Sequence, residues 1–575
     1  MLAMFKYLKG YTLQIIGIVV FTLAGSVLEL YLPTLMADVV DIGIVNNDMP
    51  FILQTGGWMI VCALAAILFT IAVSYFSSKV ALGFGRDVRR SLFIHVENFS
   101  LQSFDKIGPA SLITRTTNDV KQIQDVLNMM LRMMTRAPLM LVGGIILAVS
   151  RDPVLSLVFL GALPLLALSI FLISRKAIPY FTSLQKKTDR LNLILREGLI
   201  GIRVVRAFNR VSFEKQRFNE ANEDFRDTGI KVNKLMALLF PMMMIMMNFT
   251  NIAIVWFGAI RIDAGLMQVG NLMAFLQYAM MILMSLIMLS LAFIMIPRAQ
   301  ASAKRINEIL TLEAEIKDPE NPEKDLNVKG QVEFKNVTFR YQGAEKPAIE
   351  NISFHAKAGE TTAIIGSTGA GKSTLVKLIP RFYDIEEGSI LVDGVDVRNM
   401  TQQSLRNKLG YVPQKAALFK GTIAENIKFG KTDANESEII QALTTAQALQ
   451  FVNEYDEGVE TIVEQGGANL SGGQKQRLSI ARALIRKPEI YLFDDSFSAL
   501  DYKTDAKLRE ALKQETKEAT IILVAQRVNT VIVADKIIVL NQGKISGMGT
   551  HEELLKENEV YQEIVASQHV EEVGA

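Results

Sequence analysis

Two glycine-rich segments of the sequence contain residue types that bind phosphate. The first, at 366–374, follows a short apolar run at 361–365 and fits the pattern G-x-x-x-x-G-K-[ST]. In this pattern the backbone amides of the loop surround the phosphates, the lysine reaches the outer ones, and the hydroxyl binds Mg²⁺. The sequence therefore predicts a nucleotide site with Ser373 as a magnesium ligand. Its expected residues are Gly366, Ser367, Thr368, Gly369, Ala370, Gly371, Lys372, Ser373 and Thr374.

The second segment, at 470–501, begins with a Ser-Gly-Gly-Gln turn that opens a basic helix and continues into an apolar run at 490–493. Backbone amides at the start of a helix favour phosphate. The apolar run ends in Asp494 and Asp495, and an aspartate at the end of a buried strand suits a magnesium-bound nucleotide. We therefore expect phosphate contacts at the turn and a magnesium ligand at Asp494. The turn consists of Ser471, Gly472, Gly473 and Gln474.

The sequence LSGGQ downstream of a phosphate loop resembles the signature of the ATP-binding cassette (ABC) family, over the C-terminal part of the chain. This resemblance implies that Tyr341 stacks on adenine. It also implies that Gln414 is a further magnesium ligand, in a loop that senses both magnesium and the membrane domain. Glu464 resembles the acidic loop of exporters, and Asp501 resembles the loop that crosses the dimer interface. In this family each ATP lies between the phosphate loop of one cassette and the LSGGQ of the other. The four signature residues are therefore expected to contact ATP in a partner's site.

Two positions depart from the family pattern, and both belong to the same nucleotide pocket. The family has a glutamate that activates the attacking water, whereas this chain has Asp495. Aspartate is shorter by about 1.5 Å of reach, and misplacement by about 1 Å can lower a rate roughly a hundredfold. The family also has a histidine that contacts the γ-phosphate, whereas this chain has Gln526. Glutamine forms hydrogen bonds but neither carries imidazolium charge nor shuttles a proton.

The combination of a changed pocket and an intact signature favours a heterodimer. The pocket of this chain is expected to be degenerate, while its signature completes a competent pocket on a different half-transporter that carries the glutamate and the histidine. The resemblance is to the degenerate-site subunits of bacterial heterodimeric multidrug exporters, and it implies ATP and Mg²⁺ as cofactors and amphipathic or drug-like substrates. Three alternatives remain: a tolerated substitution with continued turnover, a nucleotide-gated regulatory membrane subunit, and a homodimeric lipid flippase.

Composition agrees with a membrane-bound machine. The chain has 575 residues, of which 50% are hydrophobic and only 21% are charged, so it is long enough for several domains and too apolar for an ordinary soluble enzyme. The net charge of +2, without a basic tail, predicts no nucleic-acid partner. Cys62 is the only cysteine, which excludes a disulfide within the chain.

Six apolar stretches approach the length of about 20 residues that a bilayer requires. They lie at 15–36, 57–76, 129–149, 154–173, 236–260 and 272–296. The loops at 79–121 and 175–234 are rich in Lys and Arg, whereas 41–54 contains neither. Because positive loops stay in the cytoplasm, we expect a multi-pass protein of the cell membrane with both termini and the nucleotide-binding domain in the cytosol.

The expected architecture is a multi-domain membrane protein. An all-α domain with six spanning helices, similar to that of type IV ABC exporters, is expected at 1–312. A polar, proline-containing linker follows at 313–330, and an α/β P-loop nucleotide-binding domain occupies 331–575. By the family resemblance, 103–110 and 201–210 are expected to couple the membrane helices to the cassettes.

Several residues in the apolar stretches are candidates for contact with substrate. Glu29 is a carboxylate in the first stretch, where it attracts a cationic substrate, pairs with a basic side chain or occupies an interfacial position. Arg132 and Arg136 interrupt the third stretch and suggest that its start lies at the cytosolic boundary. Polar and flexible side chains gather in the last two stretches; the methionines are first explained as lipid-facing or packing residues, and only side chains that face the bundle interior could contact cargo, as is expected sooner of the polar ones. They are Asn248, Asn251, Gln277, Met242, Met243, Met244, Met246, Met247, Met280, Met281, Met284 and Met288.

Overall fold

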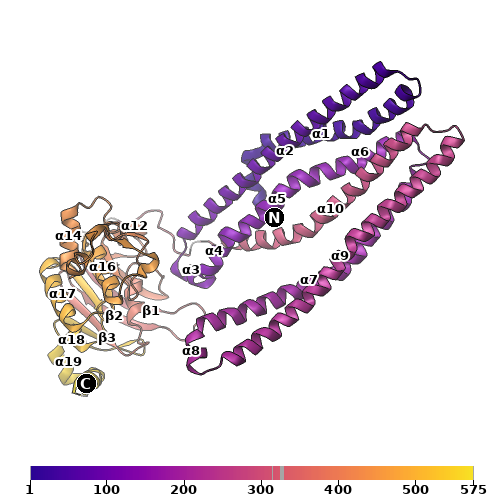
Figure 1. Cartoon of the computed structure of the whole chain (residues 1–575). Helices are drawn as coiled ribbons and strands as arrows, with labels where there is room; N and C mark the ends of the chain where they lie inside the picture. The colour runs from indigo at the N-terminus through magenta and orange to yellow at the C-terminus, as the bar shows by residue number, and fades with distance from the viewer. Residues whose placement is uncertain (1, 314, 324–328, 574–575) are drawn as a thin grey trace. The chain divides into compact units, whose positions relative to one another are not determined.

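The computed structural model describes residues 2–313, 315–323 and 329–573, which fold as two compact units (Figure 1). The first unit contains the chain up to Glu97 together with Ala110–Leu312, and the second contains Asn98–Pro109 together with the chain from Glu313 onwards. The predicted linker at 313–330 lies partly outside the described residues, at 314 and 324–328.

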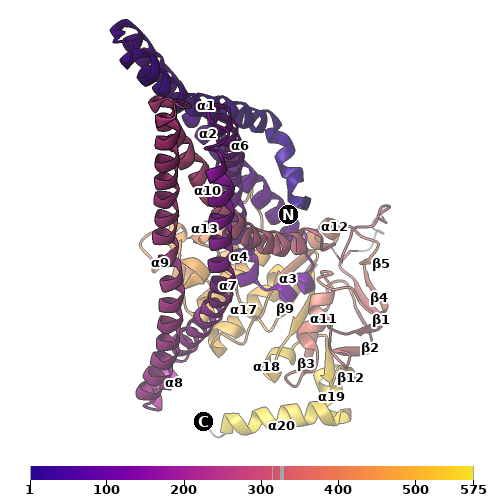
Figure 2. The same ribbon diagram turned by 90° about the vertical axis from the view of Figure 1, so that its right-hand side faces the viewer.

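The described part of the first unit contains six helical segments that are long and apolar enough to cross a membrane. Each is longer than the apolar stretch that predicted it. Because an α-helix rises 1.5 Å per residue, about 20 residues span a bilayer, and the remainder of each segment extends beyond that length. Figures 1 and 2 show them as long rods, with α7 and α9 side by side. The segments are Met4–Ile44, Met49–Glu97, Pro109–Arg151, Leu157–Ile200, Val211–Asp263 and Val269–Leu310.

Some of these segments are built from several elements. The first consists of η1 (Leu2–Tyr11), α1 (Thr12–Asp38) and the π-helical turn η2 (Val39–Ile44). The third consists of α4 (Pro109–Thr114), the π-helical turn η3 (Arg115–Asp119), α5 (Val120–Met129), the π-helical turn η4 (Met130–Met134) and α6 (Thr135–Arg151). The others are α2 (Met49–Glu97), α7 (Leu157–Ile200), α9 (Val211–Asp263) and α10 (Val269–Leu310), and α8 (Ile202–Ala207) joins α7 to α9.

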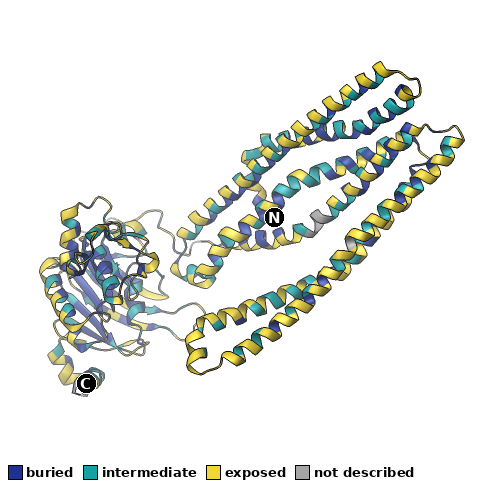
Figure 3. Cartoon of the chain, viewed as in Figure 1, coloured by how far each residue is buried: buried dark blue, intermediate teal, exposed yellow. Residues whose placement is uncertain are grey.

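Large apolar side chains cover the outside of these helices (Figure 3). Trp58 is 58% exposed and Leu160 is 72% exposed, which suits a surface that contacts lipid rather than water. The interior contains a cluster that includes Leu30, Phe275 and Tyr278. The Tyr278 hydroxyl shares a 2.8 Å hydrogen bond with Thr34 and so ties α10 to α1.

Buried or partly buried carboxylates fix the ends of the helices in the first unit. Asp41 accepts hydrogen bonds from the backbone amides of Gly270 at 2.6 Å and Asn271 at 3.0 Å, and it thereby caps the start of α10. Arg261, at the end of α9, donates a 2.5 Å hydrogen bond to Asp152. These contacts connect segments that are distant in sequence, the first with the last and the end of the third with the fifth.

The second unit contains an α/β sheet in which two central strands are buried along their whole length and a third is buried except at its two ends. Continuous apolar runs are typical of parallel strands covered on both faces, and Figure 2 shows helices around this sheet. The six-stranded sheet has the order β12-β11-β3-β10-β9-β6, in which only the edge strand β12 is antiparallel to its neighbour. Its strands are β3 (Thr361–Gly366), β6 (Leu409–Val412), β9 (Ile490–Asp494), β10 (Thr520–Val524), β11 (Lys536–Asn541) and β12 (Lys544–Gly549).

Smaller sheets and short helices complete this unit. An antiparallel sheet has the order β2-β1-β4-β5, with β1 (Val332–Phe339), β2 (Ile349–Ala356), β4 (Glu387–Val392) and β5 (Val395–Asp396); β7 (Gly421–Thr422) pairs with β8 (Ile462–Val463). The helices are α11 (Lys372–Leu378), α12 (Gln402–Asn407), α13 (Ile423–Lys428), α14 (Glu436–Thr445), α15 (Leu449–Val452), α16 (Gly472–Leu484), α17 (Tyr502–Glu515), α18 (Val528–Val531), α19 (His551–Glu557) and α20 (Glu559–Val573); η5 (Gly458–Glu460) and η6 (Gln465–Gly467) are 3-10 turns.

The first segment predicted to couple membrane helices to a cassette, 103–110, overlaps α3 (Leu101–Ile107), which belongs to the second unit. Ser100 caps α3 by accepting a hydrogen bond from the Ser103 amide, and its hydroxyl donates to Glu315 at 3.0 Å. The Tyr383 hydroxyl donates a long hydrogen bond, 3.5 Å, to Asp105. Burial raises the pKa of Tyr383 to about 12, with a smaller contribution from Asp105, so the hydroxyl stays protonated as the donor. The second predicted segment, 201–210, contains α8 and is mostly exposed in the isolated chain.

Candidate nucleotide site

The predicted phosphate loop connects β3 to α11, and its glycines are required by geometry. Gly369 and Gly371 have φ values of 84° and 98°, in the left-handed region that favours glycine. A Cβ atom on Gly371 would lie 2.7 Å from the Ala348 carbonyl oxygen, and one on Gly366 would lie 2.2 Å from that of Leu540. The loop therefore packs against neighbouring backbone on one side and leaves its other side open to a ligand.

Lys372 lies at the end of this loop and is held by the carbonyl groups of the loop itself. Its ammonium group donates to Gly366 at 2.7 Å and to Ser367 at 2.9 Å. Burial lowers the pKa of Lys372, while Asp495 and Asp494 act in the opposite direction. The lysine is thus a partly desolvated cation beside the loop, which suits an interaction with phosphate oxygens.

The two residues predicted to bind magnesium through oxygen are in direct contact. The Ser373 hydroxyl donates a 2.6 Å hydrogen bond to Asp494, which ends β9 and is 1% exposed. Gln414, the third predicted ligand, lies beside Asp495 instead, and its amide donates to that carboxylate at 3.1 Å. Parallel pairing brings these groups together, because β9 and β3 both pair with β10 and their carboxyl ends meet at one edge.

Asp495 is the most constrained residue of the site. Its backbone has a φ of 48°, which is unusual outside glycine, and its side chain accepts hydrogen bonds from Gln526 at 2.7 Å and Gln414 at 3.1 Å. Burial raises the pKa of Asp495; the hydrogen bond from Gln414 opposes this shift and the nearby Asp494 adds to it. The two positions that depart from the family pattern therefore bond directly to each other.

These residues surround one cavity of about 370 Å³. Tyr341, which is predicted to stack on adenine, lies at its edge and shares a 3.1 Å hydrogen bond with Thr374. The lining also includes both departures from the family pattern, Asp495 and Gln526. The complete lining is Tyr341, Ala348, Thr368, Gly369, Gly371, Lys372, Ser373, Thr374, Gln414, Asp495, Val524 and Gln526.

The signature residues lie away from this cavity, at the start of α16. Ser471 caps the helix by accepting a hydrogen bond from the Gln474 amide at 3.3 Å, and the Gln474 side chain accepts from the Ser471 amide at 2.8 Å. This reciprocal capping box fixes the turn. Ser471 and Gly472 are exposed and Gly473 and Gln474 are partly exposed in the isolated chain, so the turn is accessible to a ligand held by another chain.

Two other predicted residues occupy exposed turns. Asp501 is the cap of α17 and accepts a 2.9 Å hydrogen bond from the Thr504 amide; hydrogen bonds from the Thr504 backbone and side chain lower the pKa of Asp501. Glu464 is exposed in the loop before the signature, and its amide donates to Asn469 at 3.0 Å. Neither carboxylate lines the cavity of about 370 Å³.

Gln568 in α20 is a neighbour of the site that the sequence pattern did not single out. Its side chain donates to the Gln526 carbonyl at 2.7 Å and accepts from the Val528 amide at 2.7 Å. The C-terminal helix thus holds both sides of the loop that carries Gln526. No local motif marks Gln568, because its role depends on a contact between residues distant in sequence.

In the first unit, some of the polar candidates share a second cavity of about 750 Å³ between α9 and α10. Asn251, Gln277 and Met280 line it together with Trp256 and other apolar side chains. Glu29 is elsewhere, on α1, and forms an ion pair with Arg136. In the structure Glu29 therefore pairs with a basic side chain, which is one of the alternatives that the sequence left open.

The fold and the nucleotide site define an ABC protein with a membrane domain. Two family models match the chain, that of the ABC transporter transmembrane region over residues 15–310 and that of the ABC transporter over residues 349–498. The chain belongs to the ABC transporter family, as a half-transporter with one membrane domain and one cassette. The predicted fold class is confirmed. The protein is a multi-pass membrane protein with six spanning helices that acts as a dimer, and its cassette is an ATPase that binds ATP and is coupled to transport.

Relatives and a solved structure agree along nearly the whole chain. An uncharacterized ABC transporter ATP-binding protein of Mycobacterium tuberculosis is 41% identical over 98% of this chain and 97% of the relative. A putative multidrug export ATP-binding/permease protein of Bacillus subtilis is 32% identical over 98% of both. A fatty acid ABC transporter ATP-binding/permease protein of Mycobacterium bovis is 35% identical over 81% of this chain and 73% of the relative. The structure of a bacterial Atm1-family ABC exporter with ATP bound matches with a TM-score of 0.82 and 26% identity, over 96% of this chain and 98% of that one. The chain is accordingly a subunit of an ATP-driven exporter.

Proposed function

We propose that this chain is the degenerate-site subunit of a heterodimeric exporter, and that its signature completes the active pocket of a different half-transporter. The observation that carries this proposal is the hydrogen bonding of Asp495 to both Gln526 and Gln414. A carboxylate that activates water must be free to accept the proton of that water. Here the amides of Gln526 and Gln414 both donate to the Oδ2 atom of the shorter side chain, which fixes the orientation of the carboxylate, and neither amide can take up a proton.

The nucleotide-binding roles follow from the positions around the cavity. Lys372 and the loop amides would bind the phosphates of ATP, and Tyr341 would stack on adenine. Ser373 and Asp494 would hold Mg²⁺ together with Gln414, since oxygen donors and one carboxylate suit this ion, which keeps phosphate oxygens and water as its other ligands. The site would then hold ATP without hydrolysing it rapidly.

The signature supports the second half of the proposal. Ser471 and Gln474 form an ordered and accessible capping box, although the pocket of the same chain has lost the family's water-activating residues. An intact signature is useful when the pocket that it completes is active. The partner would therefore carry the glutamate and the histidine that this chain lacks, and Asp501 would lie in the loop at the interface.

Transport would follow alternating access. ATP binding closes the cassettes, hydrolysis at the partner's site resets them, and the differential affinity of ATP for the closed state shifts the equilibrium. The segments 103–110 and 201–210 would transmit the movement. Both termini would lie in the cytosol, with the membrane domain at 1–312, the linker at 313–330 and the nucleotide-binding domain at 331–575. The names of the relatives suggest drug-like or fatty-acid-like amphipathic substrates.

Co-expression with a second half-transporter that has the glutamate and histidine tests this assignment. ATP turnover of the purified assembly is measured after Asp495→Ala in this chain and after loss of the catalytic carboxylate in the partner. We expect turnover to survive the first change and to be lost with the second. Equal losses would overturn the asymmetry, and rapid hydrolysis with transport by this chain alone would favour a homodimer, including a homodimeric lipid flippase. Nucleotide binding without turnover in any assembly would favour a regulatory subunit.

A further inference from the structure

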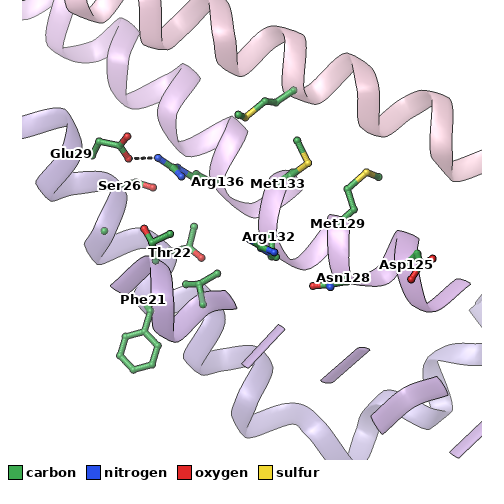
Figure 4. A pocket seen from close by; sticks show the side chains of 14 residues that line it. Phe21, Thr22, Ser26, Glu29, Asp125, Asn128, Met129, Arg132, Met133 and Arg136 are labelled. Atoms are coloured by element: carbon green, nitrogen blue, oxygen red, sulfur yellow. Dashed lines mark hydrogen bonds and ion pairs between the residues drawn. The ribbon is translucent and has the colours of Figure 1, made fainter. Parts of the chain in front are cut away.

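A cavity of about 600 Å³, lined by both charged and apolar side chains, lies inside the first unit, between α1, α2, the third helical segment and α10. Figure 4 shows labelled side chains from α1 on one side and from α5, η4 and α6 on the other, with Glu29 and Arg136 pointing toward each other. Phe21, Val73, Met129, Met133 and Met288 provide an apolar part of the lining. Flexible methionines suit an apolar group of variable shape.

The charged groups of this cavity are matched except for one. Glu29 pairs with Arg136 across the cavity (Figure 4), and Asp125 pairs with Lys121 at 2.8 Å. Among the described residues, Arg132 has no ion-pair or hydrogen-bond partner for its guanidinium group, although it lines the same space. Arg132 is exposed in the isolated chain, so its charge is available to a ligand that enters the cavity. The charge balance therefore favours an anionic ligand over a cationic one.

Two other polar groups in the lining lack partners. The hydroxyl of Ser26, a residue that is 3% exposed, and the side-chain oxygen of Asn128 are buried and form no hydrogen bond within the described residues. Buried polar groups are generally satisfied. A ligand with a polar head would satisfy them, because the Ser26 hydroxyl can donate to an anion and Asn128 can accept from a hydroxyl.

The local backbone gives a reason why Arg132 reaches this space. It lies in the middle of the π-helical turn η4, between α5 and α6. A π-helical turn inserts an extra residue into an α-helix, changes the direction of the side chains that follow, and is frequent at functional sites. Arg132 and Arg136 thus both line the cavity, on the two sides of the junction between η4 and α6.

We propose that this cavity binds the anionic head of an amphipathic substrate through Arg132, with the apolar tail against the methionines and Phe21. The proposal rests on the exporter function and specifies its substrate class as a carboxylate or phosphate head attached to an apolar chain. Arg136 and Glu29 form an adjoining ion pair. When this pair opens, Arg136 would bind a second oxygen of the head group.

Binding to the full assembly in lipid nanodiscs tests this proposal, with ligands that share a tail and differ in the head. Oleate, oleyl phosphate, oleyl alcohol and oleylamine compete with the fluorescent fatty acid cis-parinaric acid. We expect oleate and oleyl phosphate to compete best, and their ratio distinguishes a carboxylate from a phosphate substrate. Arg132→Gln should weaken binding of the anions by about tenfold or more, since hydrogen bonds to charged groups contribute about 1.5–3 kcal/mol. Arg190→Gln, on an exposed part of α7 away from the cavity, is the matched control.

Equal affinity for oleate in the wild type and in Arg132→Gln, or preferential binding of oleylamine, would overturn the proposal. Arg132→Lys should retain part of the affinity, because it keeps the charge but not the planar group. If Arg132→Gln fails to fold, Ser26→Val provides the same comparison from the opposite wall. ATP turnover is also measured, both for the assembly used in the binding experiment and for the same assembly with the partner's catalytic carboxylate removed. If ATP turnover still depends only on the partner's carboxylate but binding shows no preference among the head groups, only the proposed substrate class is rejected and the proposed function stands.

Discussion

The side chain of Gln526 donates a 2.7 Å hydrogen bond to the carboxylate of Asp495. These residues follow two neighbouring parallel strands, β10 and β9, and the family resemblance leads us to expect a histidine and a glutamate at their positions. The bond is a direct coupling between these two residues, so a change at Gln526 alone leaves the Asp495 carboxylate with the hydrogen bond from Gln414. The following predictions depend on this arrangement and on the elements that support it.

The double change Asp495→Glu with Gln526→His should restore hydrolysis at this chain's pocket. Glutamate extends the carboxylate, and histidine supplies a group that can carry charge. In an assembly whose partner lacks its catalytic carboxylate, we expect ATP turnover to rise by about tenfold or more, on the scale of general acid–base effects. Asp495→Asn with Gln526→His is the control that lacks a carboxylate. A turnover that stays at the background level would contradict the assignment of these residues.

Substitution in the signature should affect the pocket of the partner. Ser471→Arg removes the cap of α16, which stabilises a helix by about 0.5–2 kcal/mol, and places a bulky side chain where ATP is expected. We predict that ATP turnover of the heterodimer falls about a hundredfold, because displacing a reacting group by about 1 Å can lower a rate by this factor. ATP binding to this chain's own pocket, measured with the partner's phosphate-loop lysine removed, should persist. Ser437→Arg, at an exposed position in the first turn of α14, is the matched control.

Asp495→Asn should stabilise the cassette at neutral pH. Because burial raises the pKa of Asp495 above the ordinary value of 3.8, ionisation is less favourable in the folded state than in the unfolded chain. The native state thus loses stability as the pH rises from 3.8 through the raised pKa. The asparagine variant should have a higher melting temperature at pH 7.5, and its advantage should decrease as the pH falls toward 4. An advantage independent of pH would indicate another cause.

Gln568→Ala should loosen the loop that carries Gln526. The change leaves the Val528 amide without its partner, and an unsatisfied buried donor costs about 1–3 kcal/mol. We expect a lower melting temperature and weaker binding of ATP to this chain's pocket. Gln562→Ala is a control on the same helix, because Gln562 donates to Leu555 and Lys556 instead. Equal effects of the two substitutions would show that α20 contributes only general stability.

The sequence was informative where the chemistry follows from a contiguous pattern. The apolar run, the glycines and Lys372 predict a strand, a loop and a helix, and the structure has β3, the loop and α11 in that order. Asp495 and Gln526 could be identified as departures, but their hydrogen bond depends on the pairing of β9 with β10. Gln568 was missed for the same reason, since its contacts join segments distant along the chain.

The membrane segments show a similar limit. Hydropathy located the apolar middle of each helix, and the helical patterns at 191–208 and 301–306 indicated extensions beyond it, but neither indicated where each helix begins and ends. Arg132 and Arg136 were interpreted as a sign of the membrane boundary, and the structure adds that both line one cavity. The π-helical turn η4, which contains Arg132, has no sequence signal that distinguishes it from the adjacent α-helix.

The assignment of 98–109 to the second compact unit means that the chain passes between the units three times, after Glu97, Pro109 and Leu312. The cassette is thus a discontinuous folding unit. A fragment that starts at Glu313 would lack α3 and would leave Tyr383 without the carboxylate of Asp105. A soluble version of this cassette would need the α3 peptide supplied separately or fused to it.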